Sequence, residues 1–217
     1  VNVTAGALSA NKVIIEKTID STRWFFFSLP FDCQINNIVA ISANDDSLTY
    51  DTDYVISKYN PTREDGQNNA WKDLHITDKL NANQGYIIGH WYKQSNNIII
   101  KFPSTDPQTI TAPADKTLDY TNTWFVNEEN KNSSKGFNLI GMPYYQKVSG
   151  NLTPNLVTIP NKNGKTYSQT DYTNANIAPF TSFFVQVKAA PIFTITETQS
   201  AAPMLRAKDV VAKATIT

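Results

Sequence analysis

The chain of 217 residues contains a single cysteine, Cys33. One thiol cannot form an internal disulfide, so small scaffolds held together by disulfides are excluded and the fold must be held by packing. Cys33 stands among apolar neighbours in the segment 29–33, where a thiol is usually a small, inert core residue. We therefore predict that Cys33 is buried and has a structural role.

A surplus of charge is also lacking, because 19 Lys and Arg balance 19 Asp and Glu. Without an overall electric field, nothing in the composition attracts nucleic acid or an anionic membrane. No apolar run reaches the roughly 18 to 20 residues of a membrane-spanning helix. The longest, residues 24–31, is interrupted by Ser28 and Pro30. We expect neither nucleic-acid binding nor membrane insertion in this region.

Strong helix formers are scarce, whereas residues that favour strands and turns are abundant. The chain has only 5 Glu but 23 Asn and 24 Thr, and 41% of its residues are hydrophobic, enough for a core. Such a composition favours strands and turns over helices. Short strand-like runs recur at residues 12–19, 24–29, 37–41, 53–59, 85–91, 97–102, 109–112, 123–126, 137–141, 156–159, 182–187, 192–196 and 211–217. Turn-forming pairs such as Asp65-Gly66 and Asn96-Asn97 separate them, which indicates an all-β fold.

Two parts of the sequence match each other in order and character. Residues 24–31 match residues 137–144, each reading aromatic, strand, small residue, apolar residue, proline, aromatic. Residues 80–88 match residues 177–185, where a turn and a small residue precede an aromatic and aliphatic strand. Proline cannot donate to a ladder and so ends strand pairing, and a small residue permits a sharp turn. The matches indicate a β unit that occurs twice.

We therefore predict an all-β protein, a jelly-roll-like β-sandwich built from two pseudo-repeated halves. The first half covers residues 1–110 and the second covers residues 111–217, packed on the first. The two halves can bury their faces in one sandwich or each form its own, and both arrangements fit the sequence.

The matching segments also resemble known proteins. Trp24 to Asp32, Asn83-Gln84-Gly85-Tyr86, and the segments 136–144 and 177–185 resemble the repeated β modules of large secreted and cell-surface proteins of Bacteroidetes. Met142 and Ser182 stand where those modules usually have Asn and Gly. The resemblance implies an extracellular or cell-surface location, a multidomain chain, and no catalytic residues that could be carried over.

The sequence shows no pattern typical of catalysis or of cofactor binding. His75 and His90 are the only histidines, and they lack the spacing of a zinc site. The signatures of serine hydrolases, phosphate-binding loops and dinucleotide-binding folds are absent as well. We predict no enzyme, no cofactor and no metal. The acidic segment with Asp45, Asp46, Asp51 and Asp53 fits a solvated turn better than a calcium site, although carboxylates in a loop leave calcium as an alternative.

Aromatic residues carry the best hypothesis for a ligand. Sugar rings stack on flat aromatic faces while amides and carboxylates bond the hydroxyl groups. We expect Trp24, Phe26, Phe31, Phe137 and Phe183 to lie in the core. The predicted ligand-binding residues are Trp71, Trp91, Tyr92 and Asn69. Trp71 and Asn69 fall in a segment that the second half lacks, and functional loops are often insertions on a rigid scaffold.

Two functions follow from these patterns. The first is a non-catalytic structural or adhesive module of a larger secreted or cell-surface protein. Its partners would be other modules of the same chain, or host or extracellular glycans or proteins. The alternative is a carbohydrate-binding module that uses exposed Trp and Tyr side chains. The chain begins with Val and shows no signal peptide, which fits either a removed leader or a piece of a longer protein.

Overall fold

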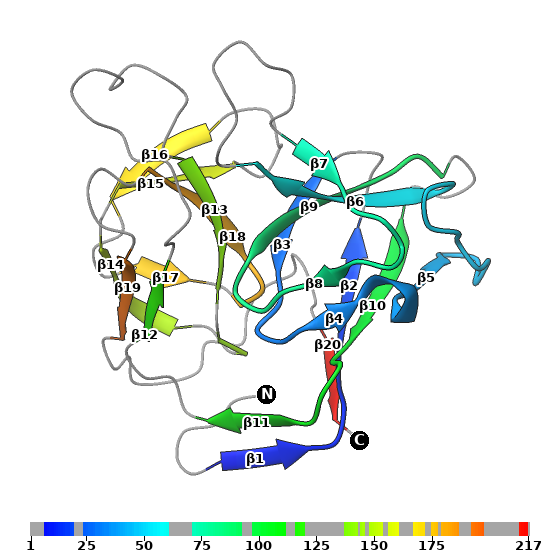
Figure 1. Cartoon of the computed structure of the whole chain (residues 1–217), viewed down its shortest axis with the longest axis horizontal. Coiled ribbons are helices and arrows are strands. Elements are labelled where there is room, and N and C mark those ends of the chain that lie inside the picture. Colours follow the sequence, from blue (N-terminus) through cyan, green and yellow to red (C-terminus); the bar gives the residue numbers. More distant parts are fainter. Residues whose placement is uncertain are drawn as a thin grey trace.

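The computed structural model describes residues 7–19, 24–60, 71–92, 97–111, 116–119, 137–142, 144–145, 148–153, 156–160, 167–171, 175–177, 179–186, 192–197 and 213–216. These residues form an all-β protein with several antiparallel sheets, as the sequence predicts (Figure 1). Among them no helix is long and apolar enough to cross a membrane. One short 3-10 helix, η1 (Ile35–Asn37), is present.

Four four-stranded sheets and two ribbons make up the described fold. Sheet I has the order β3 (Phe25–Ser28), β9 (Gly85–His90), β6 (Tyr54–Tyr59), β7 (Trp71–Asp73). Sheet II has the order β20 (Lys213–Ile216), β2 (Val13–Ile19), β10 (Ile98–Pro103), β5 (Val39–Ser42). Sheet III has the order β13 (Phe137–Gly141), β18 (Ser182–Gln186), β15 (Leu156–Pro160), β16 (Tyr167–Asp171). Sheet IV has the order β12 (Lys116–Asp119), β19 (Ile192–Glu197), β14 (Val148–Thr153), β17 (Ala175–Ile177). The ribbons are β1 (Ala7–Ala10) with β11 (Gln108–Thr111), and β4 (Cys33–Gln34) with β8 (Lys79–Leu80).

Most of the predicted strands are present in these sheets. The predicted strand at residues 37–41 begins later, at Val39, because η1 occupies the preceding residues and Ile38 N donates to Ile35 O (3.0 Å). The predicted strand at residues 123–126 lies outside the described residues. Eight strands escaped the sequence pattern, namely β1, β4, β7, β8, β12, β14, β16 and β17. Six of them have only two to four residues and carry too little periodicity to be recognised, whereas β14 and β16 are rich in polar residues.

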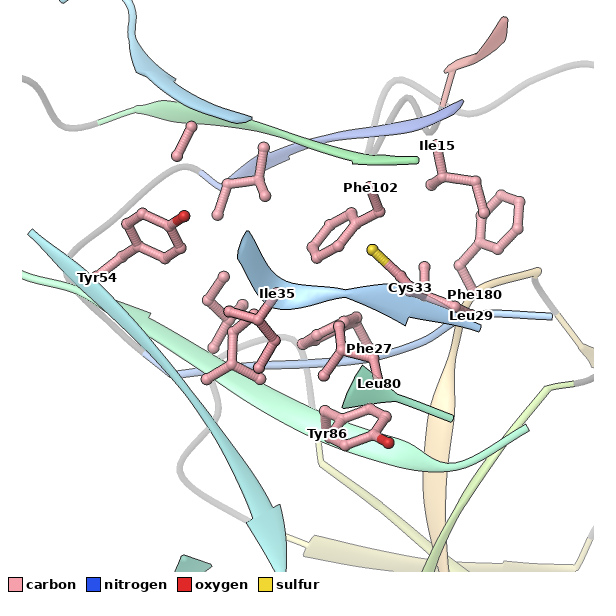
Figure 2. Packing of buried hydrophobic residues seen from close by; sticks show 14 of the residues in the cluster. Ile15, Phe27, Leu29, Cys33, Ile35, Tyr54, Leu80, Tyr86, Phe102 and Phe180 are labelled. Carbon is pink, nitrogen blue, oxygen red and sulfur yellow. The ribbon is translucent and has the colours of Figure 1, made fainter. Parts of the chain in front are cut away.

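The main core lies between sheets I and II (Figure 2). In sheet II, side chains alternate, so that Ile98, Ile100 and Phe102 of β10 are buried. Phe27 of sheet I stacks on Phe102 with ring centroids 5.1 Å apart, which joins the two sheets through an aromatic contact. Because β20 pairs with β2, sheet II contains strands from both sides of residue 110.

Sheet I is covered on both faces at its centre. All six residues of β9 are buried. Tyr86 and Ile88 point into the main core, while a second cluster with Tyr59, Leu139 and Phe184 lies on the other face, against sheet III. A strand covered on both sides needs an unbroken apolar run, which accounts for the sequence of β9.

Sheets I and III meet at the ends of two strand pairs that have the same arrangement. In sheet I, Ser28 of β3 lies opposite Gly85 of β9. In sheet III, Gly141 of β13 lies opposite Ser182 of β18. These four residues, which we call the junction, are the small residues at matching positions of the two sequence segments. The end of β9 also touches β13, through a bridge between Gln84 and Ile140.

The backbones approach very closely at the junction. A Cβ added at Gly141 would collide with the Cβ of Ser28. A Cβ added at Gly85 would collide with Leu139 Cγ and lie 2.9 Å from the Cβ of Ser182. Each contact therefore sets a glycine of one sheet against a serine of the other, at a separation that requires the glycine.

Reciprocal backbone hydrogen bonds join the two strand pairs. Ser28 N donates to Phe180 O (3.1 Å), and Gly141 N donates to Asn83 O (2.8 Å). Both carbonyls belong to residues with left-handed backbone, at φ 60° for Phe180 and 64° for Asn83. Asn tolerates this conformation, whereas a bulky side chain adopts it only where the surroundings hold it. The surroundings hold Phe180 in this conformation, because its ring is buried in the main core near Leu29 (Figure 2).

Cys33 is buried, as the sequence predicts. It lies in β4 opposite Leu80, at one end of the main core. Burial raises the pKa of its thiol to about 12, against a small opposing effect of Lys12.

We expect the thiol to resist alkylation in the folded protein, because at pH 8 almost none of it is thiolate and the sulfur is shielded. Iodoacetamide followed by mass spectrometry should label one site per chain in concentrated guanidinium chloride and none in native buffer. Rapid labelling of the native chain would contradict the burial of Cys33.

Candidate functional site

Trp71, the first of the ligand-binding candidates, lies in an aromatic cluster. It opens β7, where it pairs with Tyr59 of β6, so the expected loop position is wrong. Its half-buried ring makes edge contacts with Phe26, Tyr59 and Phe184 at centroid distances of 5.9, 5.5 and 6.2 Å. Phe184 comes from sheet III, so the indole helps to fill the space between sheets I and III.

Trp91 and Tyr92 follow the end of β9 and reach two turns. Trp91 is 45% exposed, and its Nε1 donates to Thr52 O while its backbone N donates to Asp53 O (3.0 Å). The hydroxyl of Tyr92 donates to Asp46 Oδ2 (2.8 Å), and this bond raises the pKa of Tyr92. The two aromatic side chains are therefore held in place from the polar turns beside them. Asn69, the remaining candidate, lies outside the described residues.

Trp24 is not in the core, contrary to the sequence prediction. It is 48% exposed. A Cβ added at Gly89 would lie 2.9 to 3.1 Å from three carbon atoms of its six-membered ring, Cε3, Cζ3 and Cδ2. Three ring atoms at nearly equal distances mean that the indole lies flat over Gly89. Because Gly89 has no side chain, the ring can lie directly on the strand at this position. The other face of the ring points away from the sheet.

The other predicted core aromatics divide into three cases. Phe31 is fully buried, as predicted. Phe26 is only partly buried, in the cluster with Trp71. The side chains of Phe137 and Phe183 lie outside what the structure describes.

The acidic segment forms turns between β5 and β6. Asp45 and Asp51 have left-handed backbone, at φ 65° and 60°. Asp46 accepts a hydrogen bond from Ser42 Oγ (3.1 Å) in addition to the one from Tyr92, and Asp53 Oδ2 accepts one from Thr49 N (2.8 Å). These carboxylates thus stabilise their own turns. In the described part of the chain, no three His, Cys, Asp or Glu side chains gather as metal ligands.

The two histidines lie in different elements. His75 is an exposed turn residue whose Nδ1 is 2.8 Å from Thr77 Oγ1. His90 is buried at the end of β9, opposite Tyr54.

Comparison of the chain with known protein families, with curated proteins and with solved structures gave no match. The candidate site therefore rests on its own geometry. Its exposed aromatic groups are Trp24 and Trp91, of which the sequence pattern identified only the second. The signal that could have identified Trp24 is Gly89, the fifth residue of β9, but only the pairing of β3 with β9 reveals that this glycine lies beside Trp24.

Replacing Trp71 and Trp91 by alanine should separate a packing role from a surface role. We expect Trp71→Ala to lower the free energy of unfolding by about 2 to 4 kcal/mol, because it removes a ring that three others contact. Trp91→Ala should cost about 1 kcal/mol or less, since nearly half of the residue is already exposed. Urea denaturation of both variants measures the difference, and equal losses would contradict the assignment.

Proposed function

We propose that this chain is a non-catalytic structural or adhesive β module of a larger secreted or cell-surface protein. The observation that carries the proposal is the junction, where Gly141 meets Ser28 and Gly85 meets Ser182. Contacts at this separation, together with the two reciprocal hydrogen bonds, couple sheet I to sheet III without a flexible linker. A unit coupled in this way can keep neighbouring modules or binding surfaces in a fixed relation.

The proposal includes a duplicated architecture, a jelly-roll-like β-sandwich of two related halves divided near residue 110. Three features support it. The matched segments form strand pairs with equivalent register. Asn83 and Phe180, which occupy matching positions, share left-handed backbone. Each strand pair also donates one amide to the other. The resemblance of the same segments to β modules of Bacteroidetes surface proteins supports the extracellular location.

A coupled unfolding transition tests this function. We expect Gly141→Ala to lower the free energy of unfolding by about 1 to 3 kcal/mol, because the added methyl group collides with Ser28. The loss should appear equally in the amides of β9 in sheet I and of β18 in sheet III, measured by hydrogen exchange at increasing denaturant concentration. Val39→Ala, at an exposed position of β5, is the control and should change stability by less than about 0.5 kcal/mol.

Two separate transitions for sheets I and III would contradict the proposed coupled module. Turnover of a glycoside, ester or peptide substrate in a hydrolase screen would contradict its non-catalytic character.

A second candidate function is carbohydrate binding, which is favoured by the position of the Trp24 ring, flat over Gly89. An indole that rests on the sheet with one face and points away from it with the other offers the surface on which a sugar ring stacks. Trp91 directly follows β9 and is only two residues after Gly89, so the second exposed tryptophan belongs to the same end of β9. The turns that hold Trp91 through the carbonyls of Thr52 and Asp53 add polar groups beside it, of the kind that bond sugar hydroxyl groups.

Isothermal titration with neutral plant and host oligosaccharides tests this second function. If it holds, Trp24→Ala and Trp91→Ala each abolish binding with the fold intact, whereas Trp24→Phe retains part of the affinity because a flat ring remains. The absence of binding to every glycan would leave the structural function alone. Binding that survives in both alanine variants would exclude these tryptophans as the site.

A further inference from the structure

A pocket of about 160 Å³ opens beside β6, β7 and β8, away from the exposed tryptophans. Its lining includes Lys58, Lys72, Lys79, Asp78, Asn81 and Gln84. Three lysines and two residues with side-chain amides thus line one small, polar space. The volume lies below the range of about 300 to 1,000 Å³ that suits drug-sized ligands, so one sugar unit or one charged group is the appropriate size.

Two of the lysines form an unfavourable pair. Lys58 of β6 and Lys72 of β7 lie directly opposite each other in the antiparallel ladder, so both side chains are on one face of sheet I. Like charges at opposed positions destabilise a sheet. Among the described residues no carboxylate forms an ion pair with either ammonium group. Within the described part of the chain, this pair of like charges therefore leaves room for an anionic ligand.

The nearby carboxylates are engaged elsewhere. Asp32 bonds Lys79 Nζ (2.6 Å) through one oxygen and the amide of Ala82 (2.8 Å) through the other. Asp73 accepts from Ser57 Oγ (2.6 Å), and Asp78 accepts from the amide of His75 (2.8 Å). Counted over the residues that the structure describes, the Asp32 and Asp78 charges offset two of the three lysines, which leaves a surplus of about one positive charge at the pocket.

The buried ring of Tyr86 fixes the polar groups at the pocket. Its hydroxyl accepts from the amide of Asn81 (2.7 Å) and donates to Gln84 Oε1 (3.0 Å). With the oxygen of the Gln84 amide used in this way, its Nε2 group is left as a donor for a ligand. A preformed set of donors loses little entropy when a ligand binds.

From this arrangement we propose that the pocket binds the carboxylate group of an acidic saccharide such as a uronate. A single negative charge matches the local surplus, whereas a doubly charged phosphate would overcompensate it. The amide donors and the scarcity of apolar lining suit sugar hydroxyl groups. The choice of a saccharide rests on the proposed extracellular function, while the anionic character rests on the lysines.

Isothermal titration of the full chain with tri-galacturonate at low salt tests the proposal. We expect the acid to bind, its methyl ester to fail, and Lys58→Gln and Lys72→Gln each to weaken binding by about tenfold. Lys72→Arg keeps the charge and should retain most of the affinity. Lys101→Gln is the matched control, because Lys101 lies in sheet II beside Glu16 (3.8 Å) and should leave binding unchanged.

Stability separates this role from a structural one. Lys72→Gln removes the repulsion from Lys58, so the urea midpoint should rise or stay constant while binding weakens. Equal binding of the methyl ester, unchanged affinity in the Lys58→Gln, Lys72→Gln double variant, or equally strong binding of inorganic sulfate would overturn the proposal. Failure of these titrations leaves the coupled unfolding of sheets I and III unaffected, so the two proposals fail independently.

Discussion

The close contact between glycine and serine at the junction is the constraint on which the rest of the structure depends. Gly141 and Gly85 allow the ends of two strand pairs to approach until their amides reach the carbonyls of Phe180 and Asn83. A larger side chain at either glycine would separate the backbones and break these bonds. The aromatic cluster beside the junction would open as well, because Phe184 and Leu139 reach sheet I only at this separation.

Strand β9 lies at the centre of this arrangement. One of its faces contributes Tyr86 and Ile88 to the core with sheet II, and the other faces sheet III and the ring of Trp24. Gly85 and Gly89 are four residues apart on this second face of β9. At each of them, atoms of another residue occupy the space that a side chain would fill. The two glycines of one strand therefore serve different ends. Gly85 makes room for the side chains of Leu139 and Ser182, and Gly89 makes room for the indole ring of Trp24.

The aromatic groups available at the surface are those that the core does not bury. Trp71 is taken up by the packing between sheets I and III, whereas Trp24 and Trp91 stay half exposed. The positions of two lysines also depend on where the core ends. Lys72 lies on the edge strand β7 and Lys58 lies opposite it on β6, on the same face as Tyr86, and both line a small pocket there.

By itself the sequence determined the all-β class, most of the strand positions and the burial of Cys33. These depend on local properties: β-branched and aromatic runs, alternation, and the turn residues between them. The tertiary structure alone decided which tryptophan is exposed and which lysines face each other. Trp24 carries the same local signal as the buried Phe27, and only register places Gly89 beneath it. Lys58 and Lys72 are likewise ordinary charged residues until β6 and β7 pair, because contacts between distant segments are absent from local patterns.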